Sequence, residues 1–329
     1  MTTTLGLDLA KASFDATLRL PDGTLHHRTF PNTTDGFTAL TAWLTAHVTT
    51  PVHACMEATN TYWEALATFL DAGQHTVSVV NPARIKGFAQ AEMQRNKTDK
   101  LDSALIAAFC AKHQPSAWHP LTPEHQQLRA LVRHRDDLVQ TRTQLEQRLT
   151  ESQAGFIRES LTSCITTIKT QIAAVETQLK EHVAAHPSLQ DDVRLLTSIV
   201  GIGLVTATKV LGELAPIANY TSAKAVATDA GVTPQEYSSG TSVRRKARMS
   251  KQGKAPLRAG LYMSALTTMR HCRGCRAFVD KLSARGKVKK VIIGAVMRKL
   301  LHIIYGILKH RTPYDPVKAW GDTPTHGKS

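Results

Sequence analysis

Aromatic residues are scarce in this chain. Phe, Trp and Tyr make up 5% of its 329 residues. The core must therefore be mainly aliphatic, and base stacking on aromatic rings is disfavoured as a main mode of nucleic-acid recognition. Hydrophobic residues still account for 42% of the sequence. A chain of this length and composition can bury a sizeable core and form more than one domain.

Cysteine is also rare, and its distribution excludes a disulfide framework. The five cysteines are odd in number and scattered along the chain. This pattern is typical of a reducing compartment, so we expect a cytoplasmic protein. Only Cys272 and Cys275 have the spacing of a metal-ligand pair. No second Cys or His pair stands at a usual distance, so a zinc site is not expected and the role of this pair stays open.

Long apolar runs and acidic residues are both in short supply. No stretch of about 18 uncharged apolar residues occurs, and "MTTTLGLDLA" has neither the charged nor the apolar region of a signal peptide. We therefore expect no membrane partner. There are 26 Asp and Glu against 41 Lys and Arg, which gives a net charge of +15. Such a surplus favours nucleic acid as the partner.

The first part of the chain, residues 1–113, predicts an α/β layer. "TLGLDLA", "SFDATLRL" and "LHHRTF" indicate three strands joined by hairpins. "DGFTALTAWLTAH" has helical spacing, with Asp35 as the expected N-cap. Further on, a strand "PVHACMEA", a helix ended by Gly73, a strand "HTVSVVNP" and a helix over about 98–113 follow. Three strands and then alternating helices and strands predict a mixed sheet covered by helices.

The middle part, residues 114–190, carries a heptad-like pattern. Leu131, Leu138 and Leu145 stand seven apart. The apolar positions from Ile165 to Leu179 step by three and four. This spacing predicts two long helices with an apolar seam. The seam fits an internal helical hairpin and a dimerising coiled coil equally well, because spacing does not say which chain supplies the partner helix.

The last part, residues 191–329, predicts a mostly helical domain. Two helical stretches flank Gly201-Ile202-Gly203. This pattern fits a helix-hairpin-helix, in which Gly201 and Gly203 let backbone N–H groups approach a phosphate. The alternative is an ordinary turn between helices. A dense cationic run follows, and we expect it to contact nucleic acid through Arg244, Arg245, Lys246, Arg248 and Lys251.

Four carboxylates from distant positions indicate a metal site. Asp8 lies inside an apolar strand, where a charge is costly unless it is paired or bound to a metal. Glu57 ends another strand, and Asp99 and Asp102 share a face at the start of a helix. The α/β order would bring all four together. Such a cluster binds two Mg²⁺ ions of the kind used in phosphoryl transfer. For the Asp pair alone, simple helix capping is the alternative.

The sequence segments around these acids resemble those of a known family. An acid in each of two strands and a helical DxxD resembles RuvC-like, ribonuclease-H-like nucleases. The segments "GLDLAKASFD", "MEATNTYWEALA", "VSVVNPARIKGFAQAEMQRNKTDKLDSALIAAF", "GIGLVTATKVLGEL" and "AGVTPQEYSSGTSVRRKARMSKQGKAPLR" resemble DEDD transposases of the insertion-sequence 110 family, relatives of the pilin-gene inversion recombinase. The resemblance covers nearly the whole chain in order. Asn60 departs from it, because the family usually has glycine after "EAT".

This resemblance implies a mechanism that composition does not show. Ser239 matches the family's nucleophile, which forms a covalent phosphoserine with DNA during cutting and rejoining. The resemblance further implies a Mg²⁺-dependent composite site shared between subunits of a homo-oligomer, a dimer or a tetramer. It also implies a noncoding bridge RNA that pairs with donor and target DNA. The residues themselves leave open the target, the guide sequence, the oligomer size and the order of strand exchange.

Two other functions fit part of the pattern. A structure-specific endonuclease of the junction-resolvase type would use the same carboxylates with water as the nucleophile and would need no serine. A non-enzymatic architectural protein would account for the charge, the glycine turn and the long helices, but not for Asp8 within an apolar strand.

Overall fold

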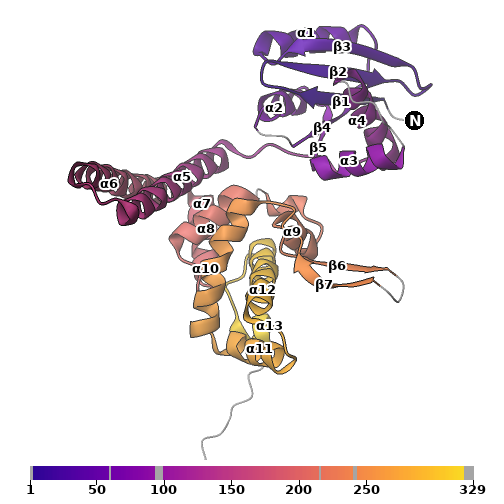
Figure 1. The fold of residues 1–329 in the computed structure, drawn as a ribbon. Helices are drawn as coiled ribbons and strands as arrows, with labels where there is room; N and C mark the ends of the chain where they lie inside the picture. The colour runs from indigo at the N-terminus through magenta and orange to yellow at the C-terminus, as the bar shows by residue number, and fades with distance from the viewer. Residues whose placement is uncertain (1–2, 59–60, 93–98, 215, 240–242, 322–329) are drawn as a thin grey trace, which may run out of the picture. The chain divides into compact units, whose positions relative to one another are not determined.

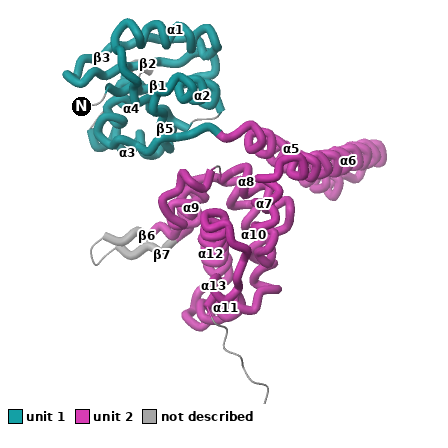
Figure 2. Tube along the Cα trace, turned by 180° about the vertical axis from the view of Figure 1, so that it is seen from behind, with its two compact units in different colours: residues 1–120 teal, residues 121–329 magenta. Residues whose placement is uncertain are grey.

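A computed structural model describes the backbone of residues 3–58, 61–92, 99–214, 216–239 and 243–321. The side chains of residues 99–100, 236–239 and 243–247 are outside the description. The chain divides into two compact units, Met1–Pro120 and Leu121–Ser329 (Figure 2).

Unit 1 is built on a five-stranded mixed sheet (Figure 1). Its strands are β1 (Thr4–Leu9), β2 (Ser13–Arg19), β3 (Leu25–Pro31), β4 (His53–Glu57) and β5 (Thr76–Val80), in the order β3-β2-β1-β4-β5. β1, β2 and β3 pair antiparallel, whereas β4 pairs parallel to both β1 and β5. The three predicted hairpin strands and the two later strands are confirmed.

Helices cover both faces of this sheet. On one face, α1 (Thr34–Thr45) and α2 (Glu64–Ala72) share a core with alternate residues of the strands, such as Leu7 and Met56. On the other face, α3 (Pro82–Ala91) and α4 (Asp99–His113) form a second core with Cys55. This division follows from the alternation of side chains along a strand.

Two local details of unit 1 differ from the expectation. The N-cap of α1 is Thr33, whose side chain accepts a bond from the Gly36 N–H, and Asp35 lies in the first helical turn. Helix α3 was not expected. Asn81 caps it and a proline occupies its first turn, while Ile85 and Phe88 bury its inner face.

Unit 2 begins with two long helices, α5 (Pro123–Glu151) and α6 (Gly155–Ala185), that pack along each other (Figure 1). Four of the predicted seam residues, Ile165, Ile172, Val175 and Leu179, are buried on α6. Within one chain the seam therefore packs as an internal helical hairpin. Its role in assembling subunits stays a prediction.

The rest of unit 2 is mostly helical, as predicted. The elements are α7 (Pro187–Thr197), α8 (Leu204–Leu214), a 3-10 helix η1 (Ile217–Asn219), α9 (Ala223–Asp229), β6 (Pro234–Ser239), β7 (Val243–Met249), α10 (Ala255–His271), α11 (Arg273–Ala284), α12 (Lys289–His310) and α13 (Pro316–Trp320). The strand pair β6–β7 was not expected and extends away from the helices of the unit (Figure 1).

The core of unit 2 explains why α5 and α6 belong to it. Leu128 of α5 and Leu179 of α6 are buried in the same hydrophobic cluster as α8 and α12. Two ion pairs join α5 to α8: Arg133 with the buried Glu213 at 2.8 Å, and Lys209 with Asp136 at 2.6 Å. The boundary at residue 190 expected from composition therefore falls inside a shared core, and the three-part division stays a prediction about function.

Among the described helices, α12 alone is long and apolar enough to cross a bilayer by length and composition. In this structure 67% of its most apolar window is buried inside the protein. Its side chains Val296, Leu300 and Ile304 are fully buried in the core of unit 2. This is the pattern of a central core helix.

The burial of the thiols gives a simple test of the fold. Cys164 on α6 is exposed, whereas Cys55, Cys110, Cys272 and Cys275 are buried. Burial also raises the pKa of Cys275 to about 12, which keeps its thiol protonated. We expect iodoacetamide to modify one thiol quickly in the native protein and the other four only after unfolding. Mass spectrometry of peptides, with Cys164→Ser as the control, measures this, and rapid labelling of Cys55 or Cys110 would contradict the packing of unit 1.

Candidate active site

Asp8 and Glu57 lie side by side at the ends of two neighbouring strands. β1 and β4 are parallel, with Gly6 opposite Cys55 and Leu7 opposite Met56. One further step along both strands brings Asp8 beside Glu57. Leu7 and Met56 belong to the core under α1 and α2. Because side chains alternate along a strand, Asp8 and Glu57 face the side that α3 and α4 cover. Both are partly exposed.

Helix α4 runs across this face in the opposite direction to β1. The Thr4 hydroxyl donates to the Ala107 carbonyl at 3.0 Å, and Gly6 lies against the backbone of Ser103 and Ala107. Two strand residues span about 6.7 Å, and one helical turn of nearly four residues spans about 5.4 Å. The same correspondence, continued by one step, brings the start of α4 at Asp99 over Asp8.

A second row of α4 follows β4. The Cys110 thiol donates to the His53 carbonyl at 3.6 Å, and Ile106 is buried in the same cluster as Cys55. Asp102 is one turn before Ile106 on this row, at the level of Glu57. The two acids of the DxxD pair therefore correspond to two different strands. The side chain of Asp102 is partly exposed, and that of Asp99 lies outside the described residues.

The ligand types suit a hard cation, because carboxylate oxygens are what Mg²⁺ prefers. The described side chains do not by themselves complete a metal cage. Among them, no three His, Cys, Asp or Glu groups lie close enough together to hold an ion. Asp8, Glu57 and Asp102 are included in that statement and Asp99 is not. The structure thus brings the elements that carry the four predicted ligands to one edge of the sheet. The binding of a metal ion by these four acids stays a prediction.

Sequence reasoning missed the residues that hold α4 against the sheet. The Ser103 and Thr17 hydroxyls are 2.8 Å apart, and both are buried. A methyl group on Gly6 would lie 2.1 Å from the Ser103 carbonyl oxygen and 2.3 Å from the Ala107 nitrogen. The available signal was a glycine inside an apolar strand, which often marks a close backbone approach.

Two buried thiols lie behind the acids. Cys55 precedes Glu57 by two residues on the same strand face, and Cys110 belongs to the same core cluster. A hydrogen bond to Cys110 and burial raise the pKa of Cys55. The Cys55 thiol is therefore neutral and contributes packing rather than charge to the floor of the site.

The predicted serine lies in unit 2, at the outer end of the β6–β7 strand pair. Ser239 is the last residue of β6 and pairs with Val243 of β7. Arg244, Arg245 and Lys246 follow in β7. The side chains of these four residues lie outside the described residues. Arg248 is exposed, and Lys251 lies just after the strand with a φ of 55°.

Two later cations of this run have structural roles at the base of the strand pair. The Arg258 guanidinium donates to the carbonyls of Ala230 at 3.0 Å and Gly253 at 3.2 Å. The Lys254 ammonium lies 3.0 Å from an Asp229 carboxylate oxygen and donates to the Glu213 carbonyl. These contacts join the two ends of the segment that carries Ser239, so its base is fixed to α8, α9 and α10.

The two glycines of the predicted phosphate grip differ in their surroundings. Gly201 has a φ of 95° and lies against α10, where a Cβ would be 2.5 Å from the Thr268 hydroxyl oxygen. The fold therefore requires this glycine whether or not a phosphate binds. Gly203 is exposed, with no atom within 4 Å of an added Cβ, and directly precedes α8. Contact with a backbone phosphate at Gly203 stays a prediction.

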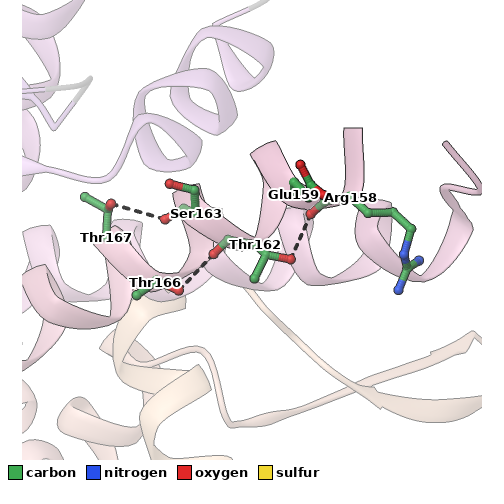
Figure 3. A pocket seen from close by; sticks show the side chains of 6 residues that line it. All are labelled: Arg158, Glu159, Thr162, Ser163, Thr166 and Thr167. Atoms are coloured by element: carbon green, nitrogen blue, oxygen red, sulfur yellow. Dashed lines mark hydrogen bonds between the residues drawn. The ribbon is translucent and has the colours of Figure 1, made fainter. Parts of the chain in front are cut away.

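A shallow pocket on α6 contains none of the predicted site residues (Figure 3). It is lined by Arg158, Glu159, Thr162, Ser163, Thr166 and Thr167. The hydroxyls of Thr162, Thr166 and Thr167 each donate to a carbonyl one turn earlier in the same helix. Their hydrogen bonds are thus already satisfied, and the pocket shows no constellation of catalytic groups.

Comparison with known proteins agrees with the order of these elements. Residues 5–152 match a family model described as a transposase, and residues 193–280 match the "Transposase IS116/IS110/IS902 family". The first match includes all four acids, and the second includes Ser239 and the cationic run.

One relative matches almost the whole chain, and others match about half of it. A pilin gene-inverting protein of Moraxella bovis is 33% identical over 320 residues, which cover 95% of this chain and 98% of that protein. The transposase for the insertion sequence element IS1328 of Yersinia enterocolitica is 27% identical over 199 residues, 50% of this chain and 56% of that protein. An IS110 protein of Streptomyces coelicolor is 28% identical over 47% of this chain and 37% of its own length. The chain therefore belongs to the IS110 family of transposases.

Proposed function

We propose that this protein cuts and rejoins DNA in a Mg²⁺-dependent reaction through a covalent bond between DNA and Ser239. The observation that carries the proposal is the register of unit 1. In that register Asp8 and Glu57 each follow the opposed residues Leu7 and Met56 by one position. Helix α4, which begins at Asp99, packs antiparallel to β1 on the sheet face to which both acids belong. Membership in the family supports Ser239 as the nucleophile, because the family match over residues 193–280 includes this serine.

Each part of the chain has a distinct task in this proposal. In this proposal, β1, β4 and α4 supply the carboxylates of Asp8, Glu57, Asp99 and Asp102 at one edge of the sheet. When bound there, Mg²⁺ would stabilise the attacking and leaving oxygens of phosphoryl transfer. The Ser239 oxygen bonds to phosphorus as a phosphorus–oxygen bond of the DNA backbone breaks, and the departing sugar keeps that oxygen as a hydroxyl. The serine proton goes to a carboxylate or to solvent, and the departing sugar oxygen takes up a proton from the same carboxylate or from solvent, so that the protons balance. A phosphodiester is conserved, so the strand can be rejoined without net hydrolysis.

The partners of this reaction are part of the same proposal. We infer donor and target DNA, a bridge RNA as guide, and a homo-oligomer whose composite site takes acids from one subunit and Ser239 from another. We also propose that unit 1 is RuvC-like and that unit 2 contains a helix-hairpin-helix. In this proposal α5 and α6 form a coiled coil that assembles subunits. The location would be cytoplasmic and nucleoid-associated. The support is the family membership and the net charge of +15.

A second candidate is a structure-specific endonuclease that uses water as the nucleophile. The specific observation in its favour is that all four acids belong to unit 1, whereas Ser239 belongs to unit 2. A reaction confined to unit 1 would release free cut ends. The recombinase would instead leave protein attached to DNA.

The serine is tested by trapping that attachment. A labelled, nicked DNA substrate is incubated with protein and Mg²⁺, and the products are separated under denaturing conditions. Ser239→Ala is expected to abolish the covalent adduct while its DNA affinity stays within about twofold, because one hydroxyl contributes little to a mainly electrostatic contact. Ser238→Ala, the neighbour in the same strand, is the matched control and should retain the adduct. Equal adduct in both variants would remove Ser239 from its role, and free ends without an adduct would favour the endonuclease.

A further inference from the structure

Five exposed cations lie on the last turn of α11, the turn that follows it and the start of α12. We call these residues the α11–α12 corner: Lys281, Arg285, Lys287, Lys289 and Lys290. Within the part of the chain that the structure describes, none of the five is paired with a carboxylate. Asp280 is the only acidic residue between Tyr237 and Tyr314. The corner is thus an uncompensated positive surface outside the Arg244–Lys251 run.

The corner is held on a rigid frame. The Gly286 N–H donates to the Ser283 carbonyl at 2.9 Å, and the Lys287 N–H donates to the Leu282 carbonyl at 3.2 Å. These bonds close the end of α11. Beyond the turn, Ile292 and Ile293 anchor the start of α12 in the core. The cations therefore project from fixed backbone, and ordering them on a ligand costs side-chain entropy alone.

The charges at the start of α12 disfavour folding, whereas Lys281 and Arg285, at the C-terminal end of α11, are placed favourably for the dipole of that helix. Lys289 and Lys290 are the first residues of α12, which has no acid in its first turn. Positive side chains at a helix N-terminus oppose the helix dipole, and like charges a few residues apart repel. A bound polyanion would remove both penalties.

The corner adjoins the strand pair that ends in Ser239. The terminal methyl carbon of Met249, the last residue of β7, lies 2.9 Å from a Cβ built on Gly294 of α12. Lys290 is one turn before Gly294, about 6 Å along the same helical row. Arg248, next to Met249, is exposed. Positive charge therefore continues from the end of β7 onto the corner within one unit.

We propose that the α11–α12 corner binds the phosphate backbone of duplex DNA beside the β6–β7 strand pair. No aromatic residue occurs between Phe278 and Tyr305, so the corner has no platform for stacking unpaired bases. Exposed lysines spaced along a rigid turn suit regularly spaced phosphates. DNA is the chosen nucleic acid because the family consists of transposases. The proposal needs neither Mg²⁺ nor the chemistry of Ser239.

The test measures DNA affinity against salt in the full-length protein. A short duplex of arbitrary sequence is titrated by fluorescence anisotropy in EDTA, at salt concentrations between about 50 and 200 mM. The triple variant Lys287→Gln, Lys289→Gln, Lys290→Gln removes three corner charges. The control triple Lys180→Gln, Lys224→Gln, Lys318→Gln removes the same charge from exposed positions on α6, α9 and α13.

The corner variant should weaken binding about tenfold or more and make the log–log salt slope shallower by about 2.7, because each lost phosphate contact accounts for about 0.9. The control should keep the native slope. Equal effects of the two triple variants, or an unchanged salt slope in the corner variant, would overturn the proposal. So would a corner variant that loses affinity for an RNA duplex but keeps its affinity for the DNA duplex. Because the measurement is made in EDTA, Ser239→Ala should behave as the native protein, and failure of the catalytic proposal would leave this result unaffected.

Discussion

Replacing Asp102 by Asn is expected to lower Mg²⁺-dependent DNA cleavage about a thousandfold. Asparagine keeps the size of the side chain and one oxygen but removes the negative charge that would hold a divalent cation in the proposed site. Metal ions at such sites contribute several kcal/mol to the stabilisation of the transition state, and each 1.4 kcal/mol is about tenfold in rate. Single-turnover cleavage of a labelled duplex over a Mg²⁺ titration measures the loss.

The competing explanation predicts a much smaller effect. If Asp102 only stabilises the start of α4 through the helix dipole, its loss costs about 0.3–1 kcal/mol of stability. The melting temperature would then fall by a few degrees, and cleavage at 25 °C would continue. The size of the loss in cleavage rate and its dependence on Mg²⁺ therefore distinguish a metal ligand from a helix cap at Asp102.

A matched control accounts for the change in net charge. Asp137→Asn removes one carboxylate from an exposed position on α5, a helix of unit 2. Both variants make the protein more positive, so DNA affinity should stay equal or rise slightly in each. Full cleavage by Asp102→Asn would show that the DxxD pair is a helix cap and would remove Asp102 from the metal site.

The elements of unit 1 could be predicted because their signals are local. Alternation of apolar residues, a turn at "PDGT" and the strand–helix order were sufficient for the five strands. Helix α3 was missed because Gly87 and several polar residues dilute its pattern. Its two buried residues, Ile85 and Phe88, matter only once α4 and β5 lie beside them.

The strand pair β6–β7 could not be predicted for a related reason. "EYSSGTSVRRKARM" has serine, glycine and arginine where a half-buried strand would alternate apolar residues. Its pairing is stabilised at the base, by Arg258 and Lys254 on carbonyls that are distant in sequence. No window of the sequence around Ser239 contains those contacts.

The sequence singles out the candidate acids, whereas the residues that hold their elements together could not be predicted from it. Asp8 stood out as a charge in an apolar strand, and the DxxD pair as neighbours on one helical face. Which helix packs on β1, and how closely, is decided by long-range packing. Gly6 and Ser103 therefore appeared ordinary in the sequence, although they set the distance between the strand acids and the helix acids.

Gly6→Ala is expected to disable the proposed metal site without changing any carboxylate. An added Cβ would lie 2.1 Å from the Ser103 oxygen, 2.3 Å from the Ala107 nitrogen and 2.9 Å from the Ala107 Cα. All three are backbone atoms of α4, so the helix itself must move away from β1. A displacement of about 1 Å at a reacting centre costs about a hundredfold in rate, and overpacking a core costs about 1–3 kcal/mol of stability.

The control for this variant is Gly87→Ala in α3, where no atom lies within 4 Å of the added Cβ. Alanine is favoured over glycine inside a helix by about 1 kcal/mol, so this variant should be as stable as the native protein or more so, with native cleavage. Gly6→Ala should bind DNA normally, since the cationic run and the α11–α12 corner belong to unit 2. Its rate of DNA cleavage should fall about a hundredfold. The rate is measured well below the melting temperature of the variant, where essentially all of the protein is folded. A folded Gly6→Ala protein with native cleavage would mean that the spacing between β1 and α4 does not govern the chemistry, and the placement of the acids on these two elements would then lose its mechanistic meaning.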